Sequence, residues 1–278
     1  MDVKVVNFRS NSVEQDILAS VQDTGFVVLT HHGIDFGLIK EAQSSWRQFF
    51  LAAQDYKNAY LNPRNGNLGY KGFKGEMAVG AKKPDLKEYF HWRSGGRLPT
   101  EAAAVTMIMF EQLEDIALKV LGILDKKGER HDYRQSCEGS DNTILRSLYY
   151  PALDFSQEPD AVRAAAHEDI NHITLLVAAT SAGLEVKDAQ GNWHAVPHEK
   201  NSIVVNLGDM LQLASGGIYR STTHRVVNPD NSRSDRISIP LFVHPRSNTL
   251  LAPGTTAQEY LNQRIATIHG HALMGAGK

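Results

Sequence analysis

The chain has 278 residues and a mass of 30.8 kDa, and 42% of its residues are hydrophobic, which is enough for one domain with a sizeable core. A net charge of -2 and a pI near 6.6 give no electrostatic reason to expect nucleic acid or an anionic membrane as a partner. The single cysteine, Cys137, excludes an intrachain disulfide, and no apolar run reaches the roughly 18 residues of a membrane span. We therefore expect a cytoplasmic protein, either a monomer or a homo-oligomer.

Apolar residues recur at helical spacing in the first half of the chain. A first helix is predicted after Ser12, which can form a capping box with Gln15. The run from Phe26 to Leu29 is typical of a buried strand. A second helix is predicted between residues 38 and 50, and a long one from about Thr100 to Lys126.

After Thr143 the pattern changes to short strands separated by turns. The predicted strands are Ile144 to Tyr149, Ile173 to Ala178, Leu184 to Val186, Trp193 to Val196, Ile203 to Asn206, Thr222 to Val227 and Arg236 to Val243. Many short antiparallel strands at this spacing indicate a jelly roll. A closing helix is predicted from Gln258 to Ile268.

These patterns predict a single domain over residues 1–278 that is mainly β with flanking helices, an α+β fold. Residues 1–140 are expected to form a helical N-terminal part with substrate-side loops. Residues 141–250 are expected to form the jelly-roll core, and residues 251–278 a C-terminal helix and tail.

An H-x-D motif with a later histidine is the most informative feature of the sequence. If residues 165–169 form a strand, His167 and Asp169 lie on one face and Glu168 on the other. His224, in a second strand-like run, can supply a third ligand. Two imidazoles and one carboxylate can occupy one face of an octahedral metal and leave the opposite positions open, as in the facial triad of non-haem Fe(II) oxygenases.

A second constellation follows in the strand predicted from Arg236 to Val243. Arg236 and Ser238 point to one face of this strand, whereas Ile237 and Ile239 point to the other. A guanidinium and a hydroxyl on one face suit a carboxylate ligand. An unpaired arginine would be costly to bury in so apolar a run, which favours a ligand for it.

Further motifs run in the same order as those of a known family. They are Asp23 to Ile34 (with His31 where Asn is usual), Phe49-Phe50 followed by Tyr56-Lys57, Asp85 to Phe90, Tyr149 to Pro151, Ile173 to Leu176, Asn206 to Gln212, Ser221 to Val226, and Arg233 to Phe242. Over about residues 20–265 the chain resembles the isopenicillin N synthase-like Fe(II)/2-oxoglutarate-dependent oxygenases, also called the iron/ascorbate oxidoreductase family.

The resemblance implies a double-stranded β-helix, which is a jelly roll, with helices packed against it. It also implies Fe(II), 2-oxoglutarate and O2 as cofactors and cosubstrates, with ascorbate as a further candidate. The implied residues are His167, Asp169 and His224 as metal ligands and catalytic residues, with Arg236, Ser238 and Tyr150 binding 2-oxoglutarate. Because Asp169 is present, hydroxylation, desaturation or ring closure is favoured over halogenation.

The sequence departs from the family's pattern at Leu148, where many relatives have an asparagine that helps to place 2-oxoglutarate. Arg146 is two residues earlier on the same strand face and is expected either to compensate or to form an ion pair at the edge of the core. Substrate contacts are expected around Tyr70, Lys71, Tyr89 and His91, with Phe242 near the mouth of the site.

The function that the resemblance implies is oxidation of a small molecule such as an amino acid, a peptide or a secondary metabolite, with release of succinate and CO2. An oxidase of the isopenicillin N synthase type, which uses O2 without 2-oxoglutarate, is an alternative, because its Arg-x-Ser pair binds the carboxylate of the substrate. A metal-binding protein without oxidative activity is the other alternative.

Overall fold

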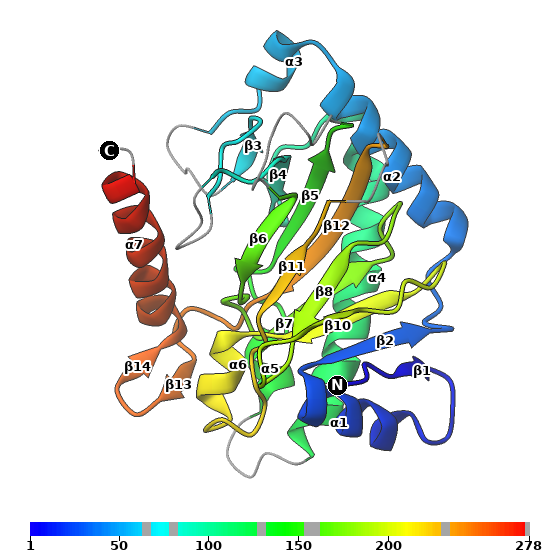
Figure 1. Cartoon of the computed structure of the whole chain (residues 1–278), viewed down its shortest axis with the longest axis vertical. Helices are drawn as coiled ribbons and strands as arrows, with labels where there is room; N and C mark the ends of the chain where they lie inside the picture. The colour runs from blue at the N-terminus through cyan, green and yellow to red at the C-terminus, as the bar shows by residue number, and fades with distance from the viewer. Residues whose placement is uncertain (63–67, 78–82, 127–131, 153–161, 229–233, 276–278) are drawn as a thin grey trace.

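The computed structural model describes residues 1–62, 68–77, 83–126, 132–152, 162–228 and 234–275. Its centre is two facing sheets (Figure 1). The larger has eight strands in the order β1 (Val5–Asn7), β2 (Phe26–Thr30), β10 (Ile203–Leu207), β7 (Ile173–Val177), β12 (Arg236–Val243), β5 (Ile144–Tyr150), β4 (Glu88–Trp92) and β3 (Gly69–Lys71). The smaller has the order β6 (Ala164–His167), β11 (His224–Val226), β8 (Leu184–Lys187) and β9 (Trp193–Ala195). Except for β1 with β2, the strands within each sheet pair antiparallel, as the predicted jelly roll requires.

Helices cover the face of the large sheet that lies away from the small sheet (Figure 1). The helices on this face are α1 (Val13–Thr24), α2 (Phe36–Leu51) and α4 (Thr100–Asp125), and α5 (Tyr133–Cys137) packs against α4. The other described helices are α3 (Gln54–Asn58), α6 (Asp209–Ala214) and α7 (Ala257–Gly275); α6 contacts β13 (Leu250–Ala252), which pairs with β14 (Thr255–Thr256), and α7 follows β14 and stands apart from the sheets (Figure 1). Among the described residues, no helix is both long and apolar enough to span a membrane.

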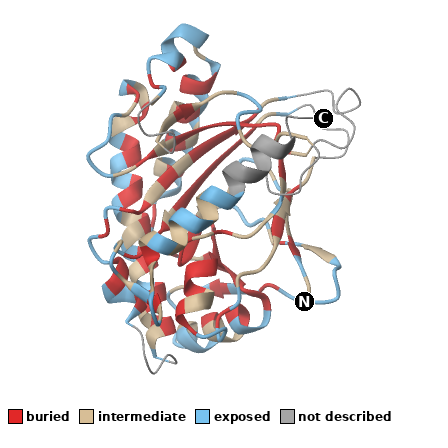
Figure 2. Cartoon of the chain, turned by 90° about the vertical axis from the view of Figure 1, so that its left-hand side faces the viewer, coloured by how far each residue is buried: buried red, intermediate tan, exposed pale blue. Residues whose placement is uncertain are grey.

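The main apolar core lies between these helices and the large sheet, where Figure 2 shows the buried residues concentrated. Trp46 of α2 is fully buried, and its indole N–H donates to Thr106 Oγ1 of α4 at 3.0 Å. Its ring packs against Phe49, Phe50 and Phe90, with centroids 5.7, 5.9 and 5.1 Å away. Trp46 therefore joins α2 and α4 to the sheet. Large buried aromatic surfaces of this kind contribute strongly to stability.

Alternation along the strands separates this core from the space between the sheets. On β12, Ile237 and Ile239 belong to the helix-side core, as predicted, so Arg236 and Ser238 face the other way. The register pairs Arg236 with Tyr150 on β5, and Ser238 with Leu148. The polar residues of interest therefore gather between the two sheets.

Three details differ from the sequence-based expectations. The strand predicted over residues 165–169 ends at His167, so Asp169 lies in the following loop. Ser12 precedes α1 but makes no side-chain capping bond; its hydroxyl donates to Asp16 instead. The N-terminal part also supplies β1, β3 and β4, and only β2 was expected. β1 and β3 have three residues each, which is too short to show a pattern, and the polar residues of β4 gave no strand signal.

Replacing Trp46 with alanine should lower the free energy of unfolding by about 3 to 5 kcal/mol, because the cavity left between α2, α4 and the sheet cannot collapse fully. Leu51→Ala on the same helix is the control: Leu51 is 53% exposed, so its loss should change stability by about 0.5 kcal/mol or less. Denaturant unfolding measures both values. Equal effects of the two substitutions would contradict the packing role of Trp46.

Candidate metal centre and carboxylate pocket

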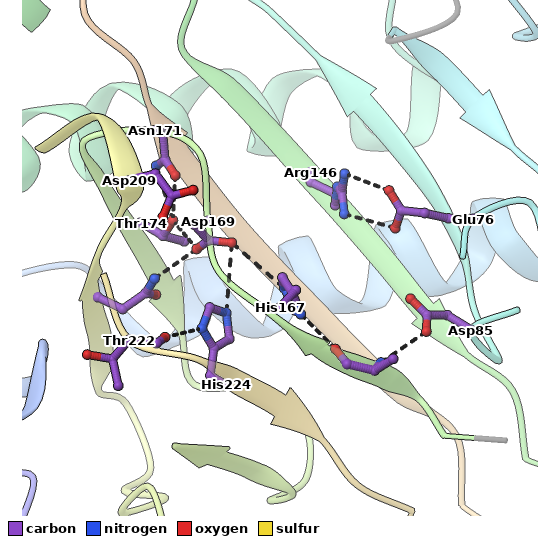
Figure 3. Close-up of polar contacts among 12 residues, drawn as sticks. Glu76, Asp85, Arg146, His167, Asp169, Asn171, Thr174, Asp209, Thr222 and His224 are labelled. Carbon is purple, nitrogen blue, oxygen red and sulfur yellow. Dashed lines mark hydrogen bonds and ion pairs between the residues drawn. The ribbon is translucent and has the colours of Figure 1, made fainter. Parts of the chain in front are cut away.

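His167, Asp169 and His224 converge between the two sheets (Figure 3). The register of the small sheet places His224 of β11 opposite His167 of β6, with ring centroids 4.4 Å apart. Asp169 Oδ1 lies 3.8 Å from Nε2 of each histidine. The three ligand atoms all lie within 4.8 Å of one another, and this is the only such group among the described residues.

Backbone hydrogen bonds orient both imidazoles. Nδ1 of His167 lies 2.8 Å from the carbonyl oxygen of Ala165, and Nδ1 of His224 lies 3.1 Å from that of Thr222. A carbonyl can only accept, so each Nδ1 carries the proton in the neutral ring and donates. Nε2 of each ring then carries the lone pair and lies 3.8 Å from Asp169 Oδ1, and second-sphere partners prepare histidines for a metal in this way.

The two oxygens of the Asp169 carboxylate have different contacts. Its Oδ2 accepts hydrogen bonds from Thr174 Oγ1 on β7 at 2.6 Å and from Asn206 Nδ2 on β10 at 2.8 Å. Its Oδ1 remains directed at the two histidines. The large sheet therefore holds the carboxylate, and the small sheet supplies the imidazoles.

The Asn206-Leu207-Gly208-Asp209 segment supports the same loop. A Cβ at Gly208 would lie only 2.2 Å from the carbonyl oxygen of Asn171, so the close approach of the two backbones requires glycine. The N–H of Asp209 donates to the carbonyl of Asp169 at 2.8 Å. This segment was noted in the sequence as a motif without a role, and its role emerges only from contacts between segments far apart in the chain.

Electrostatics favours the ionised carboxylate and the neutral imidazole. Burial alone would raise the pKa of Asp169, but His224, His167 and the two hydrogen bonds outweigh it and lower the pKa below its ordinary value. Burial, followed by the proximity of His224, lowers the pKa of His167. Both groups are thus in the protonation state that a metal ligand needs.

The donor set fits a divalent first-row metal such as iron: two imidazole nitrogens, one carboxylate oxygen and no further protein ligand among the described residues. Glu168 lies outside the group and accepts a hydrogen bond from Thr223. The structure therefore brings together the three predicted ligands and leaves Glu168 out, in agreement with the sequence-based expectation.

Arg236 and Ser238 are both buried on the inner face of β12. The Arg236 guanidinium lies over the ring of Tyr150, 5.1 Å from its centroid, and its Nε donates to the carbonyl of Ser181 at 3.1 Å. Its buried Nη1 has no partner among the described residues. Burial lowers the pKa of Arg236, and Tyr150 opposes this. A buried cation with an unused N–H donor fits the carboxylate of 2-oxoglutarate.

Arg146 lies on β5, two residues before Leu148, which pairs with Ser238. Its guanidinium pairs with Glu76 through two contacts of 3.3 Å and also contacts His91. Binding of 2-oxoglutarate by Arg146 stays a prediction. The pairing with Glu76 disfavours it, because the guanidinium already has a carboxylate partner. Tyr89 and Phe242 flank the guanidinium, with centroids 4.6 and 5.2 Å away.

Tyr70 does not lie at the substrate side, contrary to the expectation. It is buried against Phe49 in the helix-side core, and its hydroxyl donates to Glu88.

Two family profiles match the chain. That of the 2OG-Fe(II) oxygenase superfamily matches residues 141–245, and that of the N-terminal region of non-haem dioxygenases in morphine synthesis matches residues 4–106. The first contains the two histidines, Asp169, Arg236 and Ser238.

Solved structures agree along nearly the whole chain. A protein from Shewanella oneidensis described as an oxygenase is 34% identical, with a TM-score of 0.85 over 97% of this chain and 99% of that one. A 2OG-Fe(II) oxygenase family protein from Caulobacter crescentus is 30% identical, with a TM-score of 0.81 over 96% and 99% of the two chains.

Two curated relatives are more distant. The 2-oxoglutarate-dependent dioxygenase citB of Monascus ruber is 28% identical over 95% of this chain and 88% of its own length. Feruloyl CoA ortho-hydroxylase 1 of Arabidopsis thaliana is 24% identical over 90% of this chain and 71% of its own length.

Thr174→Val should weaken metal binding about 10-fold to 100-fold, because the near-isosteric valine cannot donate to Asp169 Oδ2. Thr106→Val is the matched control, since it removes the hydrogen bond to Trp46 far from the triad and should leave metal affinity unchanged. Titration of both variants with Co(II) provides the comparison. Wild-type affinity in Thr174→Val would show that this hydrogen bond does not orient the carboxylate.

Proposed function

The chain belongs to the 2OG-Fe(II) oxygenase superfamily, and from this premise we propose that His167, Asp169 and His224 hold its iron. The protein is an Fe(II)/2-oxoglutarate-dependent dioxygenase. The observation that supports the ligand assignment is the arrangement of the three donor atoms. Nε2 of each histidine lies near Oδ1 of Asp169. Nδ1 of each ring and Oδ2 of Asp169 form hydrogen bonds with other groups.

The three ligands occupy one side of the metal in this proposal and leave the other side for 2-oxoglutarate and O2. When bound, iron with 2-oxoglutarate and O2 supplies an oxidant for a substrate C–H bond, and succinate and CO2 are released. The work of the chain is to hold the donors in place, to keep Asp169 ionised, and to bind Nδ1 of each imidazole to a backbone carbonyl so that Nε2 faces the metal site.

Arg236 and Ser238 are proposed to bind the carboxylate of 2-oxoglutarate that lies away from the metal. The free Nη1 of Arg236 supports this role, because a buried guanidinium N–H without an acceptor is costly unless a ligand satisfies it. Tyr150 lies under the guanidinium and limits its movement, and we propose it as the third residue of the carboxylate pocket.

The substrate is proposed to be a small molecule that enters between the sheets beside Tyr89, Arg146 and Phe242. The feruloyl CoA hydroxylase among the relatives supports small-molecule oxidation. Hydroxylation, desaturation or cyclisation each begins with loss of a substrate hydrogen, and the ligand set allows all three. An oxidase without 2-oxoglutarate and a metal-binding protein without oxidative activity are both disfavoured by membership of a 2-oxoglutarate-dependent family.

Anaerobic titration of the Fe(II)-loaded protein with 2-oxoglutarate should produce a saturable visible charge-transfer band, because the keto acid chelates the metal. Arg236→Ala should shift the midpoint to at least about 10-fold higher 2-oxoglutarate, as expected for loss of a charged hydrogen bond. Arg225→Ala is the control, since Arg225 pairs with Glu185 and stacks on Trp193 outside the site. An unchanged midpoint in Arg236→Ala would mean that this arginine binds another carboxylate.

His167→Ala and Asp169→Ala should each abolish stoichiometric Fe(II) binding and, with it, turnover of 2-oxoglutarate to succinate. His194→Ala serves as the control, because His194 contacts Asp188 at the β8–β9 turn and should keep full metal binding. Metal content after anaerobic loading and desalting gives the result directly. Full occupancy in either triad variant would refute the ligand assignment.

A further inference from the structure

The segment that contains Asp85 and Lys87 packs against the strand that carries His167. The N–H of Leu86 donates to the carbonyl of Val162 at 3.1 Å. In the other direction, the N–H of Ala165 donates to Oδ1 of Asp85 at 3.0 Å. These contacts join the N-terminal part of the chain to β6, although 80 positions separate Asp85 from Ala165.

Ala165 connects Asp85 to the metal centre. Its N–H is bound by Asp85, and its carbonyl accepts the Nδ1–H of His167 at 2.8 Å (Figure 3). β6 has only four residues and is the edge strand of the small sheet, paired with β11 alone. A short edge strand has few bonds to fix its position. Asp85 adds a hydrogen bond from outside the sheet, to the N–H of Ala165, whose carbonyl orients His167.

Asp85 is itself held by a buried ionic network. Its Oδ2 lies 2.7 Å from Lys87 Nζ, and the same ammonium lies 2.6 Å from Glu76. The side chains of Asp85 and Lys87 are 4% and 5% exposed. Glu76 continues the network to Arg146. Separating the members of such a network would leave a buried charge without compensation, which costs free energy, so the ion pairs hold Asp85 in one position.

The charge states agree with this picture. Burial alone would lower the pKa of Lys87, but Glu76 and Asp85 outweigh it and raise the pKa above its ordinary value. Burial opposes ionisation of Glu76 as well, yet Arg146 and Lys87 hold its pKa well below the usual range. Lys87 and Glu76 are therefore both ionised at neutral pH.

We infer that Asp85 is a positioning residue for the metal centre: it holds β6 where the carbonyl of Ala165 orients His167, and Lys87 with Glu76 holds Asp85. The inference rests on the proposed function, because it requires His167 to be a metal ligand. Asp85 acts through Ala165 and contacts neither metal nor substrate. The carbonyl of Ala165 is the second-sphere partner of His167, and loss of such a partner commonly changes metal affinity about 10-fold to 100-fold.

Co(II) titration of Asp85→Ala, Asp85→Asn and a matched control tests the inference, with denaturant unfolding measured in parallel. Asp85→Ala should bind Co(II) about 10-fold to 100-fold more weakly. Its Co(II) absorption spectrum at saturation should also change, because the orientation of one ligand changes. Asp85→Asn should recover most of the affinity, since an amide oxygen can still accept from Ala165.

Asp188→Ala is the matched control. Like Asp85, Asp188 accepts hydrogen bonds from backbone N–H groups, in its case those of Gln190 and Asn192, and it contacts a histidine, but at the β8–β9 turn. Its removal should lower stability and leave both Co(II) affinity and the spectrum unchanged.

Two results would overturn the inference, and they differ in what they imply. If His167→Ala loses Co(II) while Asp85→Ala binds it as tightly as the wild type, only the positioning role is wrong. If His167→Ala also binds as the wild type does, the triad is wrong and the inference falls with it. Should Asp85→Ala not fold, Lys87→Met tests the same link by freeing Oδ2 of Asp85, and unchanged Co(II) affinity and spectrum would then refute it.

Discussion

The divided carboxylate of Asp169 is the contact on which the metal centre depends. One oxygen faces the two histidines of the small sheet, and the other is bound by Thr174 and Asn206 of the large sheet. The same side chain is therefore held by the large sheet and lies against the histidines of the small sheet. Asp169 lies in a loop, so hydrogen bonds to the large sheet are needed to hold its carboxylate in place beside the two histidines.

The interior between the sheets is unusually rich in buried charge. Lys87, Asp85 and Arg236 are all buried. Most natural cores avoid such groups because desolvation is costly, and replacing them with apolar residues often stabilises a protein. In the proposed function these charges serve the site: Nη1 of Arg236, which has no partner among the described residues, would bind a carboxylate, and the Asp85–Lys87 pair lies against the strand that carries His167.

Stability comes mainly from the opposite face of the large sheet. Alternation along β12 sends Ile237 and Ile239 to the helix-side core and Arg236 to the site. Aromatic packing around Trp46 joins α2, α4 and the sheet. The strands can therefore carry polar groups on one face, because the other face contributes the burial that keeps the fold stable.

The sequence by itself predicted the ligand types and determined the face shared by Arg236 and Ser238 and most strands after Thr143, because side-chain alternation and strand length are local properties. It did not determine that Asp169 leaves the strand after His167, because the loop follows contacts with Thr174, Asn206 and Gly208. Only the tertiary structure decided that Arg146 meets Glu76, 70 positions away, and that Asp85 meets Ala165, 80 positions away. The physical reason is that such pairings depend on which strands become neighbours, and no local pattern in one segment encodes its partner in another.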